Sequence, residues 1–82
     1  MTLNNRAWLR YVNKRGERTW TLPVSPGDKY PNFLGYVFER APMAYVSVSL
    51  QDALYMGPYR RLAYAKEKLI VHLVKLALEA EE

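Results

Sequence analysis

Four cationic side chains crowd around a predicted hairpin and are the residues best suited to bind an anionic ligand. They are Arg10, Lys14, Arg15 and Arg18, with Tyr11 among them. Cations on a two-stranded ribbon neutralise phosphates, and a tyrosine ring can stack on a base. The set predicts polyanion binding. Two alternatives stay open: a contact with another protein, and a solvated hairpin whose charges protect a strand edge from aggregation.

A second basic pair, Arg60 and Arg61, lies at the start of a long predicted helix. Backbone N–H groups at a helix start also favour an anion. The fold decides whether this pair joins the hairpin cations in one patch, and a shared patch favours nucleic acid as the ligand.

Tyrosines form a third candidate site. Their alternation and helical phase place Tyr45, Tyr55, Tyr59 and Tyr64 wholly or partly outward. Tyrosine together with methionine and arginine is typical of the core of a protein interface. These four side chains therefore predict a protein-binding surface.

No catalytic set is recognisable, and we expect a protein that is not an enzyme and uses no cofactor or metal. The chain has no cysteine, which excludes thiolate chemistry and disulfides. The single histidine, His72, falls beside Lys68 and Lys75 on the predicted polar helix face, where we expect it to be solvated. The acidic residues outside the C-terminal end are scattered singly, without the spacing of a metal-ligand set.

The bulk composition predicts one small folded domain, residues 1–82. Half of the residues are hydrophobic and the net charge is +4. This is too apolar for a disordered chain. We see no apolar signal segment and no apolar run of about 20 residues, so we expect a cytoplasmic protein without membrane contact.

Strands are predicted within residues 6–56. The run from Ala44 to Leu50 alternates most regularly, and we expect its aliphatic residues to face the core and Tyr45, Ser47 and Ser49 to face solvent. Gly35 interrupts the preceding strand, which indicates a bulge or another element packed closely over it.

A helix over about residues 59–80 follows, with Pro58 near its first turn. Its apolar arc covers roughly 200° of the circumference, more than one sheet face needs. The surplus side chains predict a homodimer contact through Ile70, Val71, Val74 and Leu78. The alternative is that the predicted loop at residues 25–32 covers them. Together the elements predict an α+β fold: an antiparallel sheet of three to five strands packed against one long C-terminal helix.

A short pattern within residues 33–70 resembles one that recurs in small phage and prophage proteins. It is carried by Leu34, Gly35, Val37, Gly57, Tyr59, Ala65 and Lys66. The arrangement is similar to the arm-type DNA-binding domains of phage integrases and to AP2-like domains, in which a three-stranded sheet with one packed helix reads DNA. The resemblance implies a phage origin and this kind of fold. Small phage proteins of this kind also include inhibitors of host or defence proteins.

We therefore expect a small non-catalytic accessory or regulatory protein that binds and modulates a macromolecular partner, for example as an inhibitor. A protein partner ranks ahead of DNA, because Tyr45, Ser47 and Ser49 stand where DNA-reading sheets present basic and aromatic side chains. The alternative is a DNA-binding domain that uses the basic 10–18 hairpin and the helix start. A second alternative is a structural or assembly protein of a virion.

Overall fold

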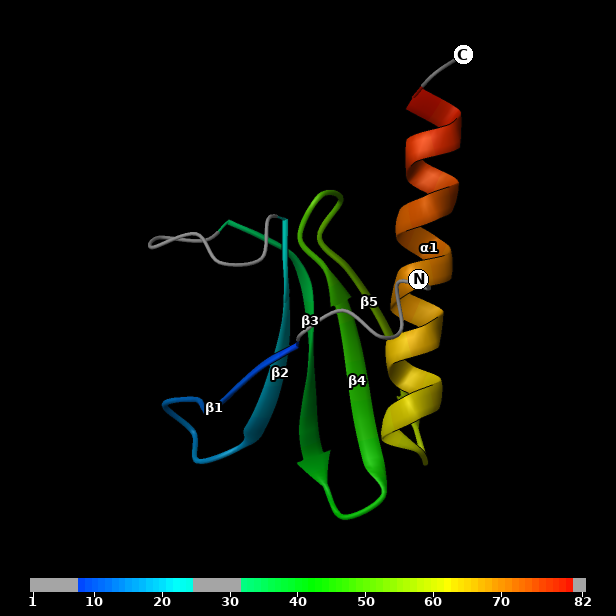
Figure 1. The fold of residues 1–82 in the computed structure, drawn as a ribbon. Coiled ribbons are helices and arrows are strands. Elements are labelled where there is room, and N and C mark those ends of the chain that lie inside the picture. Colours follow the sequence, from blue (N-terminus) through cyan, green and yellow to red (C-terminus); the bar gives the residue numbers. More distant parts are fainter. Residues whose placement is uncertain (1–7, 25–31, 81–82) are drawn as a thin grey trace.

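The computed structural model describes residues 8–24 and 32–80, which form five strands and one helix (Figure 1). The elements are β1 (Leu9–Val12), β2 (Arg18–Pro23), β3 (Phe33–Ala41), β4 (Ala44–Ser49), β5 (Leu54–Tyr59) and α1 (Leu62–Ala80). The strands lie in sequence order, each antiparallel to its neighbours. The predicted α+β fold, an antiparallel sheet packed with one C-terminal helix, is confirmed.

The turn between β1 and β2 is held by one asparagine. The Asn13 side-chain oxygen accepts hydrogen bonds from the backbone N–H groups of Arg15 and Glu17, both at 2.9 Å. Its amide nitrogen donates to the Glu17 carboxylate at 3.0 Å. Gly16 has a φ of 82°, the left-handed conformation that glycine adopts without strain. The hairpin tip therefore has a defined shape.

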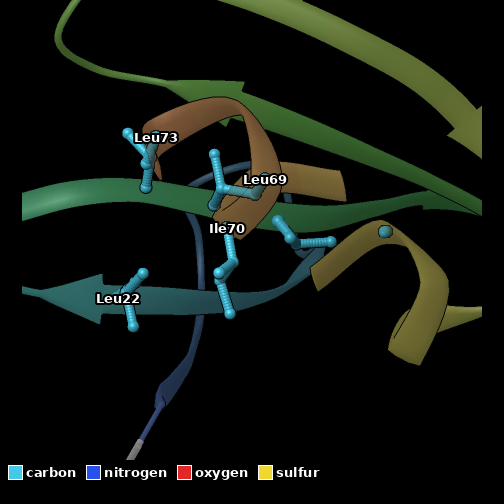
Figure 2. Packing of buried hydrophobic residues seen from close by; sticks show 6 residues of the cluster. Leu22, Leu69, Ile70 and Leu73 are labelled. Carbon is cyan, nitrogen blue, oxygen red and sulfur yellow. The ribbon is translucent and has the colours of Figure 1, made fainter. Parts of the chain in front are cut away.

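Helix α1 packs on one face of the sheet, across β3, β4 and β5. The buried cluster between helix and sheet is made of Leu22, Val37, Ala65, Leu69, Ile70 and Leu73 (Figure 2). A Cβ atom on Gly35 would lie 3.0 Å from a Leu69 methyl carbon. Of the two alternatives predicted for Gly35, a bulge or a closely packed element, the structure shows the closely packed helix.

The prediction for β4 is wrong: the strand presents its opposite face to the helix. Ser47 pairs with Val37 and Ser49 with Gly35, so both serines lie on the helix side, and both are fully buried. The Ser47 hydroxyl donates to the backbone oxygen of Ala65 at 2.6 Å. Small side chains allow the helix to lie close to the sheet, and the helix carbonyl satisfies the buried hydroxyl.

The junction between sheet and helix also differs from the prediction. Strand β5 extends to Tyr59, and the helix begins at Leu62 instead of residue 59. Pro58 lies within β5, where it is tolerated because β5 is an edge strand. Gly57 has a φ of 104°, and a Cβ atom there would lie 3.0 Å from the Tyr45 backbone oxygen.

Within the described ranges, no helix combines the length and apolarity needed to cross a membrane.

Candidate binding surface

The sheet face opposite α1 is the most distinctive surface of the molecule. We call it the open face, because among the described elements only α1 packs on the sheet, and it packs on the other side. Strand register assigns to the open face Leu9, Tyr11, Thr19, Thr21, Tyr36, Phe38, Val46, Val48 and Tyr55. None of these side chains carries a charge at neutral pH. The open face is therefore uncharged and carries aromatic, aliphatic and threonine side chains, of which Thr19, Thr21, Val46 and Val48 are buried.

Aromatic rings on this face pack over their smaller neighbours. Tyr36 and Phe38 lie with ring centroids 6.1 Å apart on β3. Val48, which pairs with Tyr36, is buried without help from the helix. Burial raises the pKa of Tyr36 to about 12, and a hydrogen bond with Tyr55 acts on it in the same direction. Tyr55 and Tyr11, on the two edge strands, remain 64% and 50% exposed.

A groove crosses one end of the open face. It consists of two adjoining hollows of about 350 and 320 Å³ that share Arg15, Glu17, Phe38 and Tyr55. We call this the aromatic groove. Its floor is formed by rings of β3 and β5, and the β1–β2 turn forms one wall.

Three cations line the aromatic groove: Lys14, Arg15 and Arg40. None of them forms an ion pair with a carboxylate in the described part of the chain. Glu17 also lines the groove, but Asn13 already binds its carboxylate. The groove therefore combines an aromatic floor with a net positive charge, three cations against the single carboxylate of Glu17.

The other hairpin cations lie on the helix side of the sheet. Arg18 binds the Glu39 carboxylate through two nitrogens, at 2.6 and 3.0 Å, and stacks on Trp20 with 5.6 Å to the ring centroid. The hydrogen bond from Arg18 is the largest cause of the lowered pKa of Glu39. Arg10 pairs in register with Trp20 and so shares this side. The predicted nucleic-acid set is thus divided between two faces.

Lys66 of the helix completes the cluster on that side. Its amine lies 5.1 Å from the Trp8 ring centroid and 5.9 Å from that of Trp20. Burial, and secondarily the charge of Arg10, lowers the pKa of Lys66. Trp8 and Trp20 therefore pack beneath a cation instead of forming part of the open face.

Antiparallel topology brings the two basic regions to the same end of the sheet. The β1–β2 turn, the β3–β4 turn and the start of α1 all lie at this end (Figure 1). Arg60 and Arg61 follow directly after β5 there, and neither forms an ion pair with a described carboxylate. They share an end of the molecule with the aromatic groove but do not line it.

The four predicted interface tyrosines do not form one surface. Tyr45 faces the helix side and packs edge-on against Trp20, with centroids 6.1 Å apart. Tyr59 packs against Tyr64 at the helix start, with centroids 5.2 Å apart. Tyr55 alone belongs to the open face.

Two further aromatic residues of the open face, Tyr36 and Phe38, were not predicted to bind a partner. Their alternation with Gly35, which the helix covers, is the signal that could have placed them on the uncovered side.

The predicted dimer set is partly buried within the monomer. Ile70 is 8% exposed and belongs to the helix–sheet core, so its assignment to a dimer contact is wrong. Val71, Val74 and Leu78 are 57%, 42% and 61% exposed and lie on the outer side of the helix. These three residues still form an exposed apolar strip.

His72 is not simply solvated. Its Nε2 atom lies 2.8 Å from a carboxylate oxygen of Asp52, which follows β4, and its side chain is only 17% exposed. The pKa of Asp52 is lowered by the neighbouring Ser49 side chain and by His72. This pair fastens the β4–β5 turn to the helix. The described residues contain no group of three histidine or acidic side chains arranged to hold a metal ion.

Comparison with known proteins finds no relative: no family model matches the chain, and no curated protein or solved structure is significantly similar to it. The resemblance to small phage proteins therefore stays a prediction.

Proposed function

We propose that this protein acts without catalysis, as a small accessory or regulatory protein that binds another protein through its open face. The observation that carries the proposal is the uncharged aromatic band from Tyr11 to Tyr55, bordered at one end by cations. An apolar aromatic centre with a polar, arginine-containing rim is the usual anatomy of a protein interface. Tyrosine and arginine also contribute disproportionately to binding energy.

The sequence-based reason for ranking a protein ahead of DNA no longer applies, because Tyr45, Ser47 and Ser49 lie on the helix side. A different reason takes its place. The cations are divided between the two sides of the sheet, and Arg18 is paired with Glu39. A binding site for single-stranded nucleic acid needs positive charge along the backbone path, and this open face is uncharged over most of its width.

The test is face-specific co-purification from the cells that produce the protein. We expect the double variant Tyr11→Ala/Tyr55→Ala to lose a protein that co-purifies with the wild type. The matched control, Leu54→Ala, removes an exposed apolar side chain from the same strand as Tyr55 but on the helix side, and should retain it. Equal retention by both variants, with unchanged thermal unfolding, would contradict binding through the open face.

Nucleic acid is the second candidate, favoured by the gathering of basic residues at one end of the sheet. Arg60 and Arg61 would supply phosphate contacts beside Lys14 and Arg15. Titration of labelled duplex and single-stranded DNA at two salt concentrations tests it. Salt-sensitive binding that weakens in both Lys14→Ala/Arg15→Ala and Arg60→Ala/Arg61→Ala would favour this candidate over a protein partner.

A further inference from the structure

We infer that the aromatic groove binds an extended acidic segment of the partner, with an aromatic side chain on the groove floor and carboxylates at its cations. This inference rests on the proposed function and specifies the chemistry of the partner at that site. The groove is the part of the open face where an apolar floor and unpaired positive charge meet.

The floor suits a ring or a large aliphatic side chain. Phe38 and Tyr55 line both hollows, and Tyr36 lies against Phe38. Val46 adds an aliphatic patch at the β5 side. An aromatic side chain seated here would lie edge-on or offset against these rings, the arrangement that aromatic pairs prefer.

The rim suits carboxylates because of its charge. Lys14 and Arg15 stand on the β1–β2 turn, and Arg40 stands at the end of β3, so the cations border the groove from two directions. Arginine binds carboxylates through two parallel hydrogen bonds. Glu17 also lines the groove, but the three cations outnumber its single carboxylate.

The shape of the turn supports binding in a fixed geometry. Asn13 bonds to the backbone of Arg15 and Glu17 and to the Glu17 side chain, so the backbone beneath Lys14 and Arg15 is held in place before a ligand arrives. A pre-ordered wall reduces the entropy lost on binding.

The test uses random twelve-residue peptides displayed on phage and selected against the immobilised full-length protein. We expect the enriched peptides to carry Asp or Glu on either side of an aromatic residue. Synthetic copies labelled with fluorescein are then titrated by anisotropy. Replacing their acidic residues with the corresponding amides should abolish most of the binding, and added salt should weaken it.

Protein variants locate the site. Arg15→Ala/Arg40→Ala should raise the peptide Kd at least about fivefold. Arg60→Ala/Arg61→Ala is the matched control: it removes the same charge at the same end of the molecule but outside the groove, and should leave the Kd within about twofold. Circular dichroism checks that both variants fold.

Three results would overturn the inference: no enrichment of peptides, enrichment without acidic residues, or equal weakening by the two double variants. Displacement of the peptide by a single-stranded oligothymidine at low micromolar concentration would also overturn it, by assigning the groove to nucleic acid. If any of these results occurs while Tyr11→Ala/Tyr55→Ala still loses a co-purifying protein, the groove inference fails and the proposed function stands.

Discussion

The two sides of strand β4 differ in a way that reverses the usual relation between polarity and helix cover. The helix-covered side of β4 carries Ser47 and Ser49, whereas the open side of the same strand carries Val46 and Val48. The covered face uses small polar side chains so that a helix can approach, and the open face keeps large apolar ones. The open face, whose side chains assigned by strand register are all uncharged, is well suited to bind a partner.

The largest effect should come from the covered face, through Leu69→Ala. Leu69 is fully buried against Gly35, so truncation leaves a cavity and should lower the free energy of unfolding by about 2–5 kcal/mol. Val71→Ala, on the exposed side of the same helix, should change it by less than about 0.5 kcal/mol. Urea unfolding followed by circular dichroism measures both. Similar costs for the two variants would contradict the packing of α1.

Ser47→Val tests the reversal directly. If Ser47 faced solvent, as the alternation in β4 predicted, a β-branched valine would leave the strand as stable or more stable. Under the helix, valine overpacks the contact and removes the bond to the Ala65 carbonyl, so we expect a loss of about 1–3 kcal/mol. Thermal and urea unfolding give the sign. A variant more stable than the wild type would contradict the burial of Ser47 under the helix.

Leu78→Glu sharpens the comparison between the open face and the outer side of the helix. We propose, as the sequence predicted, that the exposed strip of Val71, Val74 and Leu78 supports self-association. A charge at position 78 should shift the monomer–dimer equilibrium toward the monomer, because dimer formation would bury an unpaired charge. Sedimentation equilibrium measures this shift. Sedimentation of the wild type as a monomer, or no shift in the variant, would remove the helix as a dimer contact.

The smallest expected effect is spectroscopic. The Tyr36 pKa of about 12 lies above the ordinary value of 10, so its neutral form is favoured in the folded state. The neutral Tyr36 hydroxyl therefore makes its full contribution to the free energy of unfolding below pH 10. This contribution is lost as the pH rises toward 12. Absorbance of tyrosinate at high pH should show one late-titrating tyrosine that is absent in Tyr36→Phe. Titration of all tyrosines together near their ordinary pKa would mean that Tyr36 is not packed as described.

The sequence predicted the element types well because alternation and helical spacing report them directly. The antiparallel sheet and the C-terminal helix follow from that periodicity, and the core residues Ala65, Leu69 and Leu73 recur at helical spacing. Alternation does not show which face of a strand a helix covers. The aliphatic residues of β4 therefore led to the prediction that their side faces the helix, which is wrong. Gly35 held the missing information, because a helix can approach closely where a strand lacks a side chain.

The candidate site could be predicted only in part. The sequence identified the hairpin cations but not their positions. Strand register places Arg10 and Arg18 on the helix side of the sheet, whereas Lys14 and Arg15, on the turn, line the groove. Arg40 was not singled out, since its role depends on a groove that exists only after β3 and β5 are placed. Such tertiary proximity has no signature within any one segment.

Photo-crosslinking from the open face tests the central claim most directly. A benzoylphenylalanine is placed at Tyr55, on the open face, and in a second protein at Lys75, on the exposed side of the helix. Both proteins are irradiated in the cells that produce them. The adducts are then digested and identified by mass spectrometry. Binding through the open face predicts a discrete adduct with another protein from position 55, and from position 75 no adduct except one with a second copy of this chain. Equal adducts with another protein from both positions, or an adduct of nucleic acid from position 55, would contradict it.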